Sequence, residues 1–131
     1  MGNSESIQKV NFEDIQTIIK NPANYIVINT LDKHNQSCLI KNTTNIDNEE
    51  ILINENLKNK KMKIVIYGKN SSDDLIYKKY KQLLMIGNNN LFVYTGGLFE
   101  WLCLQDIYGF DEFPTTSKEL DILKYKSKTI I

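Results

Sequence analysis

Short apolar runs alternate along this chain with longer stretches in which apolar residues recur at every third or fourth position. The densest runs span residues 25–29, 63–67 and 91–94, and each is rich in β-branched or aromatic residues. Runs of this kind are typical of strands that are covered on both faces. Two weaker runs, at 6–10 and 38–40, predict further strands.

The stretches between these runs have the spacing of amphipathic helices. They predict helices over residues 11–20, 47–57, 73–86 and 98–107. Asn11 is a suitable N-cap for the first helix, Asp47 or Asn48 for the second, and Gly87 ends the third. Glu49 and Glu50 would then lie in the first turn of the second helix, where the helix dipole favours acids. The residues expected to face the core from the first two helices are Phe12, Ile15, Ile18, Ile19, Ile51, Leu52 and Leu57.

The alternation of strands and helices with short connections predicts an α/β fold. Its centre would be a mostly parallel five-stranded sheet with right-handed crossovers and helices on both faces. In such sheets the functional site lies at the carboxyl ends of the strands. The loops after Asn29, Tyr67 and Tyr94 are therefore the candidate positions.

The composition is that of one globular domain. The 131 residues are 41% hydrophobic and 24% charged, which is enough for a single core. Sixteen basic and sixteen acidic side chains cancel, so nucleic acid is not an expected partner. No apolar run is long enough to cross a bilayer and no secretory signal is visible. Together with Cys38 and Cys103 in apolar contexts, this predicts a cytoplasmic, intracellular protein with reduced, buried cysteines.

The first six residues fit the pattern for N-myristoylation, with Gly2 as the acceptor and Ser6 at the required position. The alternative is a flexible start over residues 1–5 without a lipid, and we favour it because the pattern is short. One acyl chain would hold the protein to a membrane only weakly and reversibly. The lipid hypothesis therefore predicts a membrane-peripheral protein.

The run at 63–67 leads directly into a polar loop. Gly68 breaks the strand, and Ser71 is a candidate N-cap for the next helix, with Asp74 three residues on as a short capping box. A strand, a tight loop and a helix N-terminus in succession are typical of an anion site, because backbone N–H groups and the helix dipole converge there. Here, however, Asp73 and Asp74 place two carboxylates where that positive potential would act.

The same loop offers no convincing nucleophile. Ser71 and Ser72 lack a nearby base, because the only histidine, His34, falls in a polar loop, so helix capping is their preferred role. A thiolate would need positive surroundings to lower its pKa. Lys69 is one flexible charge against two fixed acids.

Three stretches together resemble a single rhodanese-like domain. They are Tyr25-Ile-Val-Ile-Asn29, Ile64-Val-Ile-Tyr-Gly68 and Leu91-Phe-Val-Tyr-Thr-Gly-Gly-Leu-Phe-Glu-Trp101. The stretch Gly96–Trp101 is similar to the closing Gly-Gly…Trp segment of that family. The resemblance covers residues 7–110 and implies a three-layer sandwich. The stretch from Gln105 to Thr116 is similar to a subgroup of small rhodanese-like proteins from protists and large DNA viruses.

The resemblance also divides the chain. It implies a flexible start at 1–5, a rhodanese-like domain at 6–110 and a C-terminal extension at 111–131. The extension still has apolar residues to bury, namely Leu120, Ile122, Leu123 and Tyr125. We therefore expect it to pack back on the domain.

In the rhodanese-like family the loop after the fourth strand begins with a nucleophilic cysteine that carries a persulfide, and an arginine follows a few positions later. The resemblance places Gly68 at the cysteine and Asp73 near the arginine, and Asn29-Thr30 where an aspartate usually ends the second strand. All three departures imply lost activity, with no catalytic residue, no cofactor and no metal. What remains is a vestigial loop made of Gly68, Lys69, Asn70, Ser71, Ser72 and Asp73.

Three functional hypotheses follow. The first is a catalytically inactive rhodanese-like module that binds an unidentified protein partner through the 68–73 loop or the aromatic region at 101–116. The second is an active sulfurtransferase, or a phosphatase of the related loop type, with a nucleophile that the sequence does not reveal. The third is a structural virion component or a membrane-peripheral protein. We prefer the first because Gly68 has no side chain to act as a nucleophile.

Overall fold

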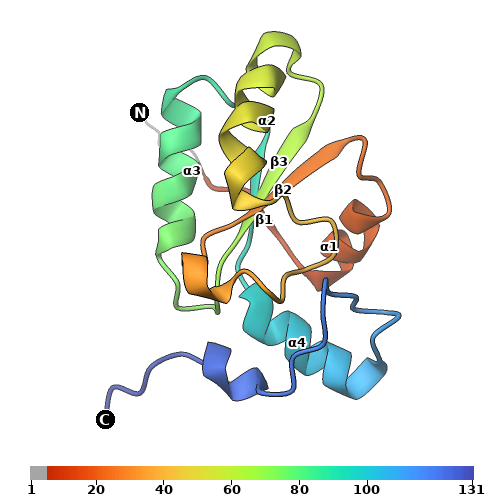
Figure 1. Ribbon diagram of the computed structural model, residues 1–131. Coiled ribbons are helices and arrows are strands. Elements are labelled where there is room, and N and C mark those ends of the chain that lie inside the picture. The colour runs from red at the N-terminus through yellow and green to blue at the C-terminus, as the bar shows by residue number, and fades with distance from the viewer. Residues whose placement is uncertain (1–5) are drawn as a thin grey trace.

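The computed structural model describes residues 6–131 (Figure 1), so the predicted lipidation site at Gly2 and the predicted flexible start at 1–5 lie outside the described residues. The chain is α/β, as predicted, with one parallel sheet in the order β1-β4-β3-β2. The strands of this sheet are β1 (Lys9–Val10), β2 (Tyr25–Asn29), β3 (Lys63–Tyr67) and β4 (Leu91–Tyr94).

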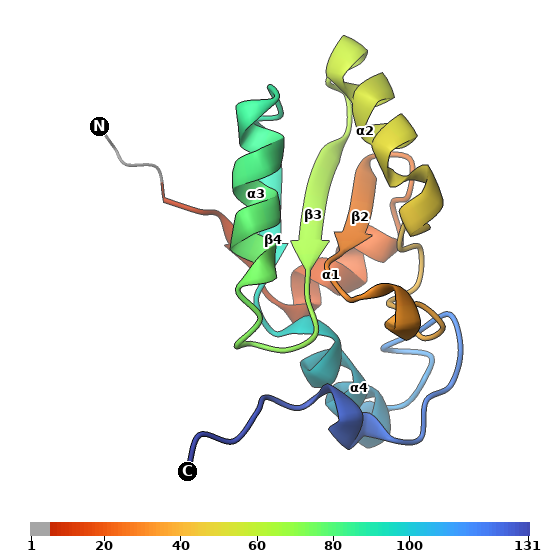
Figure 2. The ribbon, with the colours of Figure 1, turned by 60° about the vertical axis from the view of Figure 1, so that its left-hand side comes forward.

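Helices cover both faces of the sheet (Figure 1 and Figure 2). They are α1 (Phe12–Ile19), α2 (Ile46–Asn59), α3 (Leu75–Met85) and α4 (Gly97–Tyr108). Residues of β3 alternate between the two layers, because Val65 and Tyr67 pack with α1 and α4, whereas Ile64 and Ile66 pack with α2 and α3. A strand that is buried on both sides has no polar face, which explains its unbroken apolar run.

The predicted fifth strand at 38–40 is wrong. Among the described residues, this segment makes one antiparallel bridge, between Ile40 and Thr115, and β2 carries one isolated bridge to Thr43. The cause is the hydroxyl of Tyr67, which accepts the Ile40 N–H at 3.1 Å and lies 2.8 Å from Thr43 Oγ1. Because side chains and the C-terminal segment satisfy this backbone, the segment has no need of a ladder.

The starts of α1 and α2 are set by side-chain caps. The Asn11 side chain accepts the Asp14 N–H at 3.0 Å and the Asp14 carboxylate accepts the Asn11 N–H at 3.0 Å, which confirms the predicted cap of α1. The cap predicted for α2 is wrong, because Asn45 caps this helix by accepting the Asp47 N–H at 2.8 Å. Asp47 and Asn48 therefore lie within its first turn.

The face of α2 that meets the sheet differs from the predicted one. Glu49 and Ile53 are buried at helical spacing, whereas Ile51, predicted to be in the core, is 59% exposed. In α1 the predicted stripe holds, with Ile15, Ile18 and Ile19 buried. No helix within residues 6–131 is long and apolar enough to cross a membrane.

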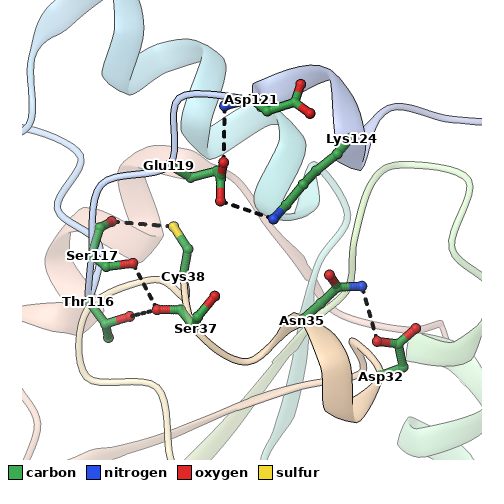
Figure 3. A network of polar contacts seen from close by, with 9 residues as sticks. All are labelled: Asp32, Asn35, Ser37, Cys38, Thr116, Ser117, Glu119, Asp121 and Lys124. Carbon is green, nitrogen blue, oxygen red and sulfur yellow. Dashed lines mark hydrogen bonds and ion pairs between the residues drawn. The ribbon is translucent and has the colours of Figure 1, made fainter.

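After α4 the chain turns back, and we call the residues beyond this helix the returning segment. Its first part lies along residues 37–41. Figure 3 shows Thr116 and Ser117 from this returning segment beside Ser37 and Cys38. The Thr116 N–H donates to the Leu39 carbonyl at 2.8 Å, and the Leu39 N–H donates to Thr116 Oγ1 at 3.1 Å. The segment thus takes the place of a neighbouring strand for this part of the chain.

The apolar residues of the returning segment are divided between core and solvent. Tyr125, at the end of the short 3₁₀ helix η2 (Ile122–Tyr125), is fully buried in the core cluster that α1 and α4 form on one face of the sheet. Ile122 packs against this cluster. Leu120 is 94% exposed and Leu123 is 64% exposed, so the expectation that they are buried is wrong. A single 3₁₀ turn directs only residues three apart to the same side.

Candidate functional site

The loops that follow β2, β3 and β4 meet at one edge of the sheet, as expected for parallel strands (Figure 2). The Thr30 N–H, just beyond β2, donates to the carbonyl of Tyr67 at 3.0 Å. The loop from Gly68 to Asp73 then crosses this edge on its way to α3. A cavity of about 640 Å³ opens beside it, lined in part by Lys69, Asn70, Ser72 and Asp73.

The side chain of Asp73 folds back over Gly68. One carboxylate oxygen accepts the Thr30 hydroxyl at 3.1 Å and the Lys69 N–H at 3.0 Å. A Cβ atom built on Gly68 would overlap this carboxylate and lie 2.9 Å from Thr30 Oγ1. The space into which a side chain at position 68 would project is therefore filled by the loop's own anion.

The same carboxylate starts α3, and Ser71 does not. The other oxygen of Asp73 accepts the Leu75 N–H at 3.0 Å, and α3 begins at Leu75. Asp74 occupies the N-cap position without a side-chain hydrogen bond, and Ser71 is exposed. The predicted cap by Ser71 is wrong because Asp73 reaches the first free N–H of the helix at shorter range.

The N-terminus of α4 is closed off by the loop. The N–H groups of Leu98 and Phe99 donate to the carbonyls of Gly68 and Lys69, each at 2.9 Å. Gly97 allows this approach with a φ of +71°, and a Cβ on it would lie 2.8 Å from the backbone nitrogen of Asn70. These two first-turn N–H groups, which could otherwise bind an anion, are occupied by backbone oxygens.

Asn70 joins the loop to the C-terminal segment. Its side chain is buried, its Oδ1 accepts the Ser72 N–H at 2.9 Å, and its Nδ2 donates to the carbonyl of Tyr125 at 2.9 Å. Ser127 adds a hydroxyl contact to Ser72 at 3.1 Å. The loop is thus held from both sides, by α4 and by the chain end.

The electrostatics of this edge are more balanced than the loop sequence indicates. Lys126 and Lys128 line the same cavity as Lys69, together with the acids Asp32 and Asp73. Sequence reasoning missed these two lysines because they lie more than fifty residues beyond the loop. No local pattern indicates that the chain end returns to this edge.

A second feature that the sequence did not reveal lies under the Gly96-Gly97 turn. The buried hydroxyl of Tyr94 donates to the Glu100 carboxylate at 2.6 Å. Burial and the adjacent carboxylate raise the pKa of Tyr94 well above the usual range of a phenol. This pair holds α4 to the end of β4 with the phenol kept protonated.

The other nucleophile candidates are not brought to the loop. His34 is exposed, and its ring makes no hydrogen bond within the described part of the chain. Cys38 is 1% exposed, with its thiol 3.4 Å from the Ser117 carbonyl under the returning segment (Figure 3). Cys103 lies half-buried on α4. Burial raises the pKa of both thiols, which disfavours the reactive thiolate.

Comparison with known proteins gives no assignment. No family model matches this chain, and no curated protein matches it.

Within residues 6–131, no group of three or more histidine, cysteine or acidic side chains is arranged to hold a metal ion.

Proposed function

We propose that this chain is a rhodanese-like domain, built as a three-layer sandwich, that has lost sulfur-transfer chemistry and acts by binding another protein. The observation that carries the proposal is the Asp73 carboxylate over Gly68, hydrogen-bonded to Thr30 and Lys69. The two free cysteines support placing the protein in a reducing, intracellular compartment.

The physical argument concerns both the nucleophile and its surroundings. A persulfide site needs a sulfur atom at the start of the loop and N–H donors that stabilise negative charge around it. Position 68 has no side chain, and the neighbouring Lys69 N–H is already used by Asp73. A fixed carboxylate at this point disfavours a thiolate beside it. A loop of this kind is suited to a structural or binding role.

The proposal is tested by assaying the purified full chain for thiocyanate formation from thiosulfate and cyanide, and by measuring bound sulfane sulfur from intact mass. We expect neither. Turnover that disappears in Cys38→Ser or Cys103→Ser would contradict the proposal, because it would reveal a nucleophile outside the loop.

Two variants locate the cause of inactivity. Gly68→Cys alone is expected to stay inactive, because its thiol would meet the Asp73 carboxylate. Gly68→Cys combined with Asp73→Gly removes that obstacle, and we expect the introduced thiol to react with iodoacetamide faster than in the single variant. Equal rates in the two variants would show that Asp73 does not obstruct the loop.

A further inference from the structure

A second hollow lies against α1 and α4 and shares no lining residue with the cavity beside the Gly68 loop. It encloses about 530 Å³ between the start of α1 and the end of α4. Its floor is apolar and mostly aromatic, and is made of Phe12, Leu104, Tyr108 and Phe113. Two carboxylates, from Glu13 and Glu112, stand at its edge together with Gln16. We call this hollow the aromatic groove.

The floor of the aromatic groove is preorganised. Phe113 is 3% exposed and packs edge-on against Trp101, with ring centroids 5.0 Å apart. The rings of Phe12 and Tyr108 pack against the Phe113 ring, with centroid distances of 5.8 Å and 6.1 Å. The Gln16 side chain donates to the Glu112 carbonyl at 2.8 Å and ties the two walls together. The rings of Phe12 and Phe113 are therefore already ordered, and the protein would lose little conformational entropy there when a ligand binds.

The two carboxylates of the groove have no partner within the described part of the chain. In the described part of the chain the carboxylates of Glu13 and Glu112 make no hydrogen bond or ion pair, whereas Glu49 pairs with Lys79 and Glu119 pairs with Lys124. None of the residues that line the groove is basic. Lys20 and Lys41 line an adjoining hollow, which shares Glu13, Gln16 and Glu112 with the groove, but neither lysine is within ion-pair distance of these glutamates.

Aromatic faces with free carboxylates beside them match one ligand chemistry closely. The aliphatic stem of arginine or lysine packs on rings, its cation is attracted to their faces, and its head group pairs with carboxylates. Tyr108, which is 64% exposed, offers an aromatic anchor that water now covers.

We propose that the aromatic groove binds a segment of a partner protein in which a basic side chain lies beside an apolar one. The basic side chain lies over Phe12 and Tyr108 with its head group between Glu13 and Glu112. The neighbouring apolar residue covers Leu104. This inference rests on the proposed binding function and names the surface and the chemistry of the partner.

The test applies the fluorescently labelled full chain to an array of short peptides of randomised sequence. We expect the bound peptides to be enriched in arginine or lysine beside an apolar residue. The strongest binder is then resynthesised with glutamine in place of its basic residue, and both peptides are titrated by fluorescence anisotropy at low and high salt. The glutamine version should bind at least about fivefold more weakly, with less salt dependence.

Variants assign the binding to the groove. Tyr108→Ala should weaken the basic peptide about tenfold or more, the loss typical of an aromatic anchor. Glu13→Gln combined with Glu112→Gln should remove the preference for the basic peptide over its glutamine version. The matched controls are Ile107→Ala, an exposed residue next to Tyr108 that does not line the groove, and Glu55→Gln on the opposite face of the molecule. Both should bind as the parent chain does.

Four results would overturn the inference. They are array binders without basic residues, no array binders at all, binding that survives Tyr108→Ala, and self-association of the chain that Tyr108→Ala abolishes in sedimentation experiments. The last would make a second copy the occupant. None of these results tests sulfur transfer. Thiocyanate formation, in contrast, would contradict the proposed function without affecting the peptide-binding result at the groove.

Discussion

Two hollows of similar size, the cavity beside the Gly68 loop and the aromatic groove, treat charge in opposite ways. Beside the Gly68 loop, in a cavity of about 640 Å³, the Asp73 carboxylate accepts hydrogen bonds from Thr30, Lys69 and Leu75. At the aromatic groove, of about 530 Å³, the Glu13 and Glu112 carboxylates accept none in the described part of the chain. A carboxylate that accepts hydrogen bonds from its own chain stabilises the fold, whereas an exposed carboxylate without a partner can pair with another protein.

This difference follows from what surrounds each acid. Asp73 lies between backbone N–H groups that have no other acceptor, so turning it outward would leave several donors unpaired. The Glu112 carbonyl accepts the Gln16 side chain, and its exposed carboxylate has no partner in the described part of the chain. The following experiments test how far this contrast holds, beginning with the largest expected effect.

Replacing Gly97 with alanine should destabilise the chain most. The residue has a φ of +71°, and a Cβ on it would lie 2.8 Å from Asn70 N and 2.9 Å from the Gly68 carbonyl oxygen. We expect Gly97→Ala to lower the free energy of unfolding by about 3 kcal/mol in urea titrations. Gly87→Ala is the control, because it shares a positive φ but its Cβ would make only an ordinary 3.6 Å contact, so about 1 kcal/mol is expected. Equal losses would mean that the loop is not packed tightly on α4.

Removing the Asp73 carboxylate should cost less than the Gly97 substitution but still be clear. Asp73→Ala leaves the Lys69 and Leu75 N–H groups without their acceptor, and we expect a loss of about 2 kcal/mol by the same measurement. Ser71→Ala, in the same loop but exposed, should change stability by less than about 0.5 kcal/mol. A larger loss at Ser71 than at Asp73 would restore the cap that the sequence predicted.

The tyrosines near the loop should make stability fall at high pH. Burial raises the pKa of Tyr67 and of Tyr94, so the folded chain keeps phenol protons that the unfolded chain releases. The stabilisation is complete below about pH 10, the ordinary phenol value, and is lost as the pH rises above it toward the folded pKa. Urea titrations across this range, with tyrosinate absorbance as the probe, should show stability declining. Tyr94→Phe should make the decline shallower, and an unchanged slope would contradict this assignment.

The smallest effect is expected at the edge of the aromatic groove. Glu112→Gln should change the free energy of unfolding by less than about 0.5 kcal/mol, because the carboxylate has no partner to lose. Glu49→Gln is the comparison, since that buried carboxylate pairs with Lys79 at 2.5 Å, and about 1 kcal/mol is expected. A substantial loss at Glu112 would show that the groove is structural, and the contrast with the loop would disappear.

The parts of the fold that sequence predicts well are those fixed by neighbouring residues. The strands at 25–29, 63–67 and 91–94 have the predicted bounds because each is an apolar run between breakers. The cap at Asn11 was also predictable, because its partner Asp14 lies three residues away. The strand predicted at 38–40 failed because the hydroxyl of Tyr67, distant in sequence, takes the Ile40 N–H.

The candidate site divides in the same way. Gly68, Asp73 and Asn29-Thr30 are visible in the sequence, and the resemblance to rhodanese-like domains implies a vestigial loop from these three departures. The sequence does not show that the carboxylate of Asp73 turns inward, fills the space above Gly68 and starts α3. The inward orientation depends on Thr30, which lies at the end of another strand. The aromatic groove joins residues 12–16 to residues 104–113, and only the folded topology brings these together.

The returning C-terminal segment has a consequence for how the protein is made. The N–H groups of Leu39 and Lys41 find their acceptors on Thr116 and Pro114. A chain emerging from the ribosome therefore holds these donors unpaired, and Cys38 uncovered, until residues 114–117 have been synthesised. Contacts across such long separations form late and slowly, so the nascent chain passes through a period in which it is prone to aggregate.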